Sequence, residues 1–244
     1  MLKNDISVIL NVYKRPHMLE RQIEAVLDQS VPVHPTNIHV WYNESGVVQM
    51  PPEDVRVNTY VCNWNTKFFG RFLLPLLCKT DYIAIFDDDL LPGERWFENC
   101  LDVINTEETN GILGGVGVIV GDGGEKTRVG WYSPREGITK VDFIGQAWFF
   151  RKEWAKYMWY EEPYSWDNAE DIMFCYQAQK YGGIDTFVPS YPQNDKSMWC
   201  TSTEVSWAVG RDRNASWRNK GHGAIRRQVI AHCKKNGWKT INNI

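Results

Sequence analysis

Three adjacent carboxylates, Asp87, Asp88 and Asp89, are the strongest chemical signal in the sequence. They directly follow the apolar run 82–86, which is typical of a strand buried in a parallel sheet. Neighbouring carboxylates repel one another and raise one another's pKa unless a cation neutralises them. A hard divalent ion does this, and it can bridge the oxygens of a diphosphate at the same time. The alternative is a solvated acidic turn, or the N-cap of a helix beginning near Pro92.

The elements that must position these carboxylates alternate along the first half of the chain. Apolar runs that read as strands alternate with apolar residues at helical spacing, over residues 6–10, 18–27, 38–42, 55–61, 68–77 and 82–86. This alternation predicts a doubly wound α/β sheet with right-handed crossovers. In such sheets ligands bind beyond the carboxyl ends of the strands.

Polar side chains follow each expected strand and should therefore meet at one rim of the sheet. They lie in residues 11–15, 43–44, 63–65 and 87–89. Arg15 and Arg71 can fork onto phosphate oxygens, and the Tyr13 ring can stack on a base. The alternative for either arginine is an ordinary surface position.

The second half is less regular. We expect strands at 112–120, where Gly114, Gly115 and Gly117 interrupt the apolar run, and at 141–150. A helix is expected over 169–181, introduced by Asp167-Asn168 and ended by Gly182-Gly183, and a terminal helix over about 224–236. No linker or repeat divides the chain, so a single domain over 1–244 is predicted, with halves 1–110 and 111–244.

Composition narrows the classes of partner. The formal net charge of -3 gives no general attraction to nucleic acid or to anionic lipid, so small-molecule partners are expected. The first apolar stretch is too short for a signal peptide or a membrane span. The six cysteines are scattered, which favours reduced thiols in a cytosol-like compartment. The 12 tryptophans suit sugar rings or bases as well as a core.

The run 83–89 resembles the metal-binding D-x-D motif of GT-A fold glycosyltransferases, both family 2-like and exostosin-like members. Four further segments resemble the same superfamily in the same order: 8–15, 40–43, 65–72, and 144–150 followed by 168–171. The similarity covers about residues 6–189. It implies a Rossmann-like α/β fold: a central mixed, mostly parallel sheet flanked by helices, with an irregular C-terminal acceptor-side region. The half 1–110 would bind the nucleotide-sugar, and 111–244 the acceptor.

The resemblance also implies roles for particular residues. Nucleotide-sugar binding is implied for Asn11, Tyr13, Arg15, Asn43, Asn65, Arg71, Asp87 and Asp88. Metal binding is implied for Asp87, Asp89 and His222, and acceptor binding for Trp148, Trp166 and Asp167. Asp171 would be the general base that takes the acceptor proton, with Glu170 as its substitute or acceptor-binding neighbour.

Other interpretations of these residues stay open at this point. In a configuration-retaining enzyme Asp171 would instead position the acceptor or stabilise the transition state. Carboxylates in a first helical turn are also favoured by the helix dipole alone. Core packing is the alternative for Trp148, and simple exposure is the alternative for His222.

The implied function is metal-dependent glycosyl transfer, with Mn2+ or Mg2+, from a UDP- or TDP-sugar to a hydroxyl of a glycan or small acceptor. No nucleic acid partner and no membrane span are expected. The expected location is cytoplasmic, for an enzyme that is virus-encoded or one domain of a larger polypeptide. The alternatives are a metal-dependent phosphohydrolase or nucleotidyltransferase, and a noncatalytic carbohydrate-binding protein.

Overall fold

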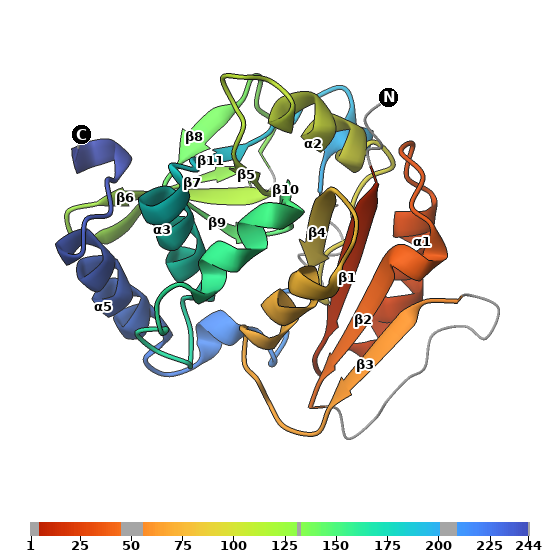
Figure 1. The fold of residues 1–244 in the computed structure, drawn as a ribbon, viewed down its shortest axis with the longest axis horizontal. Coiled ribbons are helices and arrows are strands. Elements are labelled where there is room, and N and C mark those ends of the chain that lie inside the picture. The colour runs from red at the N-terminus through yellow and green to blue at the C-terminus, as the bar shows by residue number, and fades with distance from the viewer. Residues whose placement is uncertain (1–4, 45–55, 131–132, 201–208, 244) are drawn as a thin grey trace.

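An eight-stranded mixed sheet forms the centre of the computed structural model, which describes residues 5–44, 56–130, 133–200 and 209–243 (Figure 1). The strand order is β3-β2-β1-β4-β10-β5-β11-β8. A second sheet of three strands has the order β7-β6-β9. The predicted mixed, mostly parallel α/β architecture is confirmed.

The parallel part of the large sheet comes from the first half of the chain. It consists of β1 (Ile6–Val12), β2 (Ile38–Asn43), β3 (Asn58–Cys62) and β4 (Tyr82–Phe86). In the register, Leu10 of β1 lies opposite both Val40 and Phe86, so these strands end at the same rim. The start of the predicted third strand, residue 55, lies outside the described residues.

The second half completes the same sheet and adds the smaller one. The large sheet gains β5 (Ile112–Leu113), β8 (Thr139–Val141), β10 (Trp148–Arg151) and β11 (Thr186–Val188). The small sheet contains β6 (Val116–Gly121), β7 (Gly124–Gly130) and β9 (Phe143–Gln146). Of these, β7, β8 and β11 were not expected from the sequence.

Two predicted strands are each split between the two sheets, which corrects the sequence analysis. The run 112–120 becomes β5 and β6, and the run 141–150 becomes β9 and β10. The chain changes sheets at Ala147, whose φ of 53° is unusual for a residue with a side chain. At Gly114 the segments approach so closely that a Cβ would lie 2.0 Å from Ile144 Cγ2. Gly114 and Gly115, which interrupt the apolar run in the sequence, lie between β5 and β6.

Helices cover the sheets. They are α1 (Leu19–Leu27), α2 (Trp96–Ile104), α3 (Glu170–Gly182) and α5 (His222–Lys235). Figure 1 shows α3 and α5 side by side next to the small sheet, and residues of the two helices are in contact. Gly183 ends α3 in the left-handed conformation with φ 64°, as its position predicted.

Shorter 3₁₀ segments connect these elements. They are η1 (Pro16–Met18), η2 (Pro35–Asn37), η3 (Gly70–Leu77), η4 (Lys152–Trp159), η5 (Lys196–Met198), η6 (Ser216–Arg218) and η7 (Ile241–Asn243). The helix expected over 68–77 is the 3₁₀ segment η3. Pro75 lies inside it and has no N–H to donate to a continued α-helical ladder.

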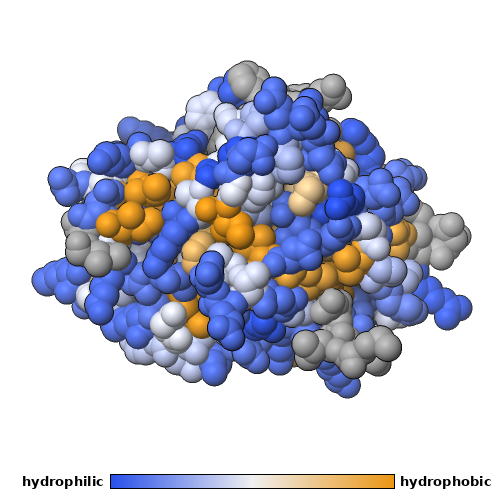
Figure 2. Space-filling view, turned by 90° about the horizontal axis from the view of Figure 1, so that it is seen from above, coloured by the Kyte–Doolittle hydropathy of each residue, from blue (hydrophilic) through white to orange (hydrophobic). Residues whose placement is uncertain are grey.

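The core lies on both faces of the large sheet, because β4 is buried along its whole length. All six cysteines are free thiols, five of them buried. None of the helices in the described ranges combines the length and apolar character needed to cross a bilayer. Figure 2 shows one face of the molecule, where apolar residues form a band across a largely hydrophilic surface.

Candidate active site

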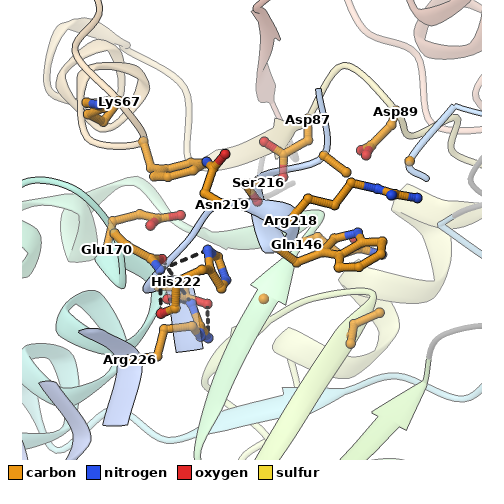
Figure 3. A pocket seen from close by; sticks show the side chains of 18 of the residues that line it. Lys67, Asp87, Asp89, Gln146, Glu170, Ser216, Arg218, Asn219, His222 and Arg226 are labelled. Carbon is orange, nitrogen blue, oxygen red and sulfur yellow. Dashed lines mark hydrogen bonds and ion pairs between the residues drawn. The ribbon is translucent and has the colours of Figure 1, made fainter. Parts of the chain in front are cut away.

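A cavity of about 840 Å³ opens at the carboxyl ends of β1, β2 and β4. The beginning of α3, parts of β6, β7 and β9, and the segment from residue 210 through the start of α5 form its other walls (Figure 3). All the predicted site residues except Trp148 and Trp166 line it. The folding of distant segments therefore brings the predicted polar clusters to one place.

The three aspartates after β4 point in different directions. The side chains of Asp87 and Asp89 are 25% and 23% exposed, whereas that of Asp88 is 6% exposed. Asp88 accepts hydrogen bonds from the Tyr13 backbone N–H (3.1 Å) and Arg15 Nη1 (2.5 Å). Burial raises the pKa of Asp88 to about 6, although Arg15 opposes the shift. Asp87 and Asp89 are thus the carboxylates that a ligand in the cavity can reach.

Arg15 ties this acidic turn to the C-terminal part of the chain. Its Nε and Nη2 donate to the two oxygens of Asp212, at 3.0 Å and 2.8 Å, and Nη1 lies 3.7 Å from Asp89. The hydrogen bond from Arg15 lowers the pKa of Asp212 to about 2. Arg15 was expected at the diphosphate, but here its guanidinium is already paired with carboxylates.

Arg71 of η3 joins the two acidic clusters. It is buried, pairs through Nη1 with Asp87, and donates through Nη2 to Glu170 at 3.0 Å. Its guanidinium lies 4.7 Å from the ring of Trp148. Arg71 therefore orients both carboxylates from the buried wall of the cavity, and its guanidinium packs on the Trp148 ring.

Trp148 corrects the sequence analysis. The side chain is fully buried and does not line the cavity, so it has no surface for an acceptor. The strand β10 places it in the core under Arg71. Trp166 is 52% exposed but packs on the ring of Phe69 at 5.0 Å, outside the cavity wall. Asp167, the third predicted acceptor residue, does line the cavity.

Glu170 and Asp171, the first two residues of α3, are both buried. Burial, followed by repulsion from Asp171, raises the pKa of Glu170 to about 7, with Arg71 acting in the opposite direction. Asp171 accepts two hydrogen bonds from Arg226 of α5, at 2.9 Å and 2.8 Å. Arg226 also donates to Glu125 of β7 at 2.6 Å. Asp171, the predicted base, is therefore held by two hydrogen bonds from the planar guanidinium of Arg226.

The backbone around this pair is strained. Ala169, immediately before α3, has φ 71°, which costs free energy for a residue with a side chain. Asn168 offsets this by accepting a hydrogen bond from the Ala169 N–H at 2.6 Å. Gly145 of β9 lies opposite, where a Cβ would come within 4.0 Å of Asp171 Oδ2. The missing side chain leaves open space beside that carboxylate.

Asn43 and Asn65 shape the rim next to β2. Asn43 is buried; its Oδ1 accepts from the Thr66 N–H and its Nδ2 donates to the Lys67 carbonyl, both at 2.8 Å. Asn65 donates to the Tyr13 hydroxyl at 2.9 Å. Asn11 lines the cavity with them and is largely buried. These contacts order the rim, so Asn43 has little left to offer a base edge.

His222 does not join the aspartates. Within the described part of the chain, no group of three or more His, Cys, Asp or Glu side chains is arranged to hold a metal. His222 Nδ1 lies 3.0 Å from the Asn168 amide, and Figure 3 shows His222 beside Arg226, away from Asp89. His222 is thus not placed with Asp87 and Asp89, and these two aspartates are the predicted metal ligands that remain.

Sequence reasoning missed Asp212, Glu125 and Arg226. Each lies beside another charged residue in a stretch without a motif, so only the three-dimensional structure connects it to the site.

Residues 7–161 match the model of glycosyl transferase family 2. The chain belongs to that family. The match spans β1 through η4, including the aspartates after β4, and the C-terminal wall of the cavity lies beyond it. A search of the curated proteins finds no match.

Among the solved structures, this family 2 glycosyltransferase is similar to the mannosyltransferase PcManGT from Pyrobaculum calidifontis, solved in complex with GDP-Man and Mn2+. The TM-score is 0.60 at 14% sequence identity. The alignment covers 98% of this chain but only 66% of that one, so the chain spans just under two thirds of that protein's length. The likeness shows the GT-A fold.

Proposed function

We propose that this family 2 glycosyltransferase moves a sugar from a nucleoside diphosphate donor to an acceptor hydroxyl with the help of a divalent metal ion. One observation carries the proposal: Asp87 and Asp89 of the β4 end and Asp171 of α3 line the same cavity. The first two can serve the charged leaving group, and the third can serve the acceptor. A single cavity thus holds groups for both halves of the reaction.

The two partly exposed aspartates fit a divalent cation. Mg2+ in such sites is held by one or two carboxylates together with substrate phosphates and water. Asp87 and Asp89 would hold Mn2+ or Mg2+ here, and the diphosphate would supply further oxygens. When bound, the ion would neutralise the charge of the leaving diphosphate. Arg15 and Arg71 keep the carboxylates oriented from behind.

On the acceptor side Asp171 is the base. To take the acceptor proton, one of its oxygens must face the hydroxyl, and the space left by Gly145 lies beside Oδ2. Arg226 holds the carboxylate in one orientation. If configuration is retained, the same placement makes Asp171 a group that positions the acceptor. Glu170 is its acidic neighbour, joined to Asp87 through Arg71.

For the donor we expect uridine or thymidine diphosphate sugars. The similar mannosyltransferase was solved with GDP-Man, which makes guanosine the third base to compare. The cavity of about 840 Å³ has the size of a small-molecule site.

Calorimetric titration of UDP, TDP and GDP tests the proposal. With Mn2+ we expect binding of UDP or TDP that chelator abolishes and that Asp89→Asn weakens at least about tenfold, the loss of one charged ligand. Asp81→Asn is the matched control, because Asp81 is exposed at the opposite end of the same strand. Absence of nucleotide binding under every metal condition would refute the proposal.

A further inference from the structure

Arginines gather at the end of the cavity far from the aspartates of β4. Arg128 of β7 and Arg227 of α5 line it there, together with Arg226. Arg226 is bonded to Asp171, so this cluster adjoins the carboxylate assigned to the acceptor. Figure 3 shows Arg226 at one end of the pocket and Asp89 at the other.

A bulge in the small sheet turns Arg128 toward the cavity. In β6 and β7, Val120 pairs with Glu125 but Ile119 pairs with Thr127, so Lys126 is the extra residue. In a regular strand, residues 125 and 128 would face opposite sides, and one extra residue brings them to the same side. Both line the cavity, and Arg128 Nη2 lies 3.5 Å from Glu125.

Arg227 is held in place against the same strand. Its aliphatic stem crosses Gly124, where a Cβ would lie 3.1 Å from Arg227 Cγ. Its guanidinium makes no ion pair with any residue in the parts of the chain that the structure describes. The stem therefore lies along the strand, and the exposed charged end is available to a ligand.

Arg227 is the arginine of this cluster that makes no ion pair within the described residues. Arg128 and Arg226 pair with Glu125, and Arg226 also pairs with Asp171. The first turn of α5 contains no acidic residue, so the helix dipole adds positive potential beside Arg227. This end of the cavity is suited to one additional anionic group.

We propose that the acceptor carries an anionic group, a carboxylate or a phosphate monoester, bound by Arg128 and Arg227. The inference rests on the proposed function, because it takes the end of the cavity beside Asp171 as the acceptor side. The donor diphosphate belongs to the opposite end, with Asp87 and Asp89. The acceptor hydroxyl then lies between Arg227 and the donor, next to Asp171.

The test is titration of three sugars, glucose, glucuronate and glucose 6-phosphate, into the protein with and without saturating nucleoside diphosphate and Mn2+. We expect one or both anionic sugars to bind at concentrations where glucose does not, and the two anions tell carboxylate from phosphate. Arg128→Gln and Arg227→Gln should each weaken that binding about tenfold, the effect of one charged hydrogen bond. Lys126→Gln, which removes a charge from the same strand outside the cavity, should leave it unchanged.

Several outcomes would overturn the inference. Equal binding of glucose and the anionic sugars would do so, as would loss of nucleotide affinity in Arg128→Gln and Arg227→Gln, which would assign these arginines to the donor. Arg227→Lys should recover part of the affinity, and equal loss in both Arg227 variants would indicate a structural role. Anionic sugars that bind while nucleotides do not would refute the proposed function and leave the anion site standing.

Discussion

Glu170→Gln should remove a pH-dependent cost to stability. Burial raises the pKa of Glu170 from 4.5 to about 7, so between these values the folded state keeps a proton that the unfolded state has lost. Stability of the wild-type protein should therefore fall as pH rises across this window, at about 1.4 kcal/mol per pH unit for this one group. Glutamine has the same shape and does not titrate, so the variant avoids this loss.

Worked over the whole window, the difference in unfolding free energy between variant and wild type should move by about 3 kcal/mol in favour of the variant. Urea unfolding of both proteins from pH 4.5 to 8 measures it. Glu98→Gln is the control of opposite sign: Arg95 lowers the pKa of Glu98, so there the wild type gains stability as pH rises. A difference for Glu170→Gln that stays flat, or that favours the wild type as pH rises, would refute the reasoning.

Two further substitutions test the geometry around Glu170. Arg71→Met leaves the carboxylates of Asp87 and Glu170 without their shared cation. The free energy of unfolding at pH 8, measured by urea titration, should therefore drop by about 3–5 kcal/mol. An unchanged value would contradict the bridging role of Arg71. Gly145→Val should fill the space beside Asp171 and lower the transfer rate about a hundredfold with little change in nucleotide affinity. Equal loss of rate and nucleotide affinity would instead point to a distorted cavity.

Much of the first half could be predicted because its signals are local. The β4 run is continuous and apolar over the length of a buried strand, and parallel strands end at one rim. That logic brought Asp87 and Asp89 together with Asn11 and Asn43, whereas Asp171 was assigned to the site only by the resemblance to the glycosyltransferases. The alternation of strand and helix signals was sufficient to predict an α/β sheet, whereas its mixed character was implied only by the resemblance.

The rest depends on long-range contacts that leave no local pattern. Ala147 changes sheets through a positive φ that nothing in its sequence context announces. The sequence around Trp148 is the same whether its ring faces a sugar or packs under Arg71. Only the register of its strand decides which side the ring faces. Asp212 meets Arg15 across most of the chain length. Such pairs are visible only after folding.

Release of nucleoside diphosphate from UDP-, TDP- and GDP-sugars tests the central claim most directly. Water, neutral methyl glycosides and glucuronate serve as acceptors, with Mn2+ or with chelator, for the wild type and Asp171→Asn. We predict metal-dependent release that Asp171→Asn lowers by about 10²–10⁴-fold while nucleotide binding persists. No release from any donor, or release by Asp171→Asn at the wild-type rate, would contradict the account.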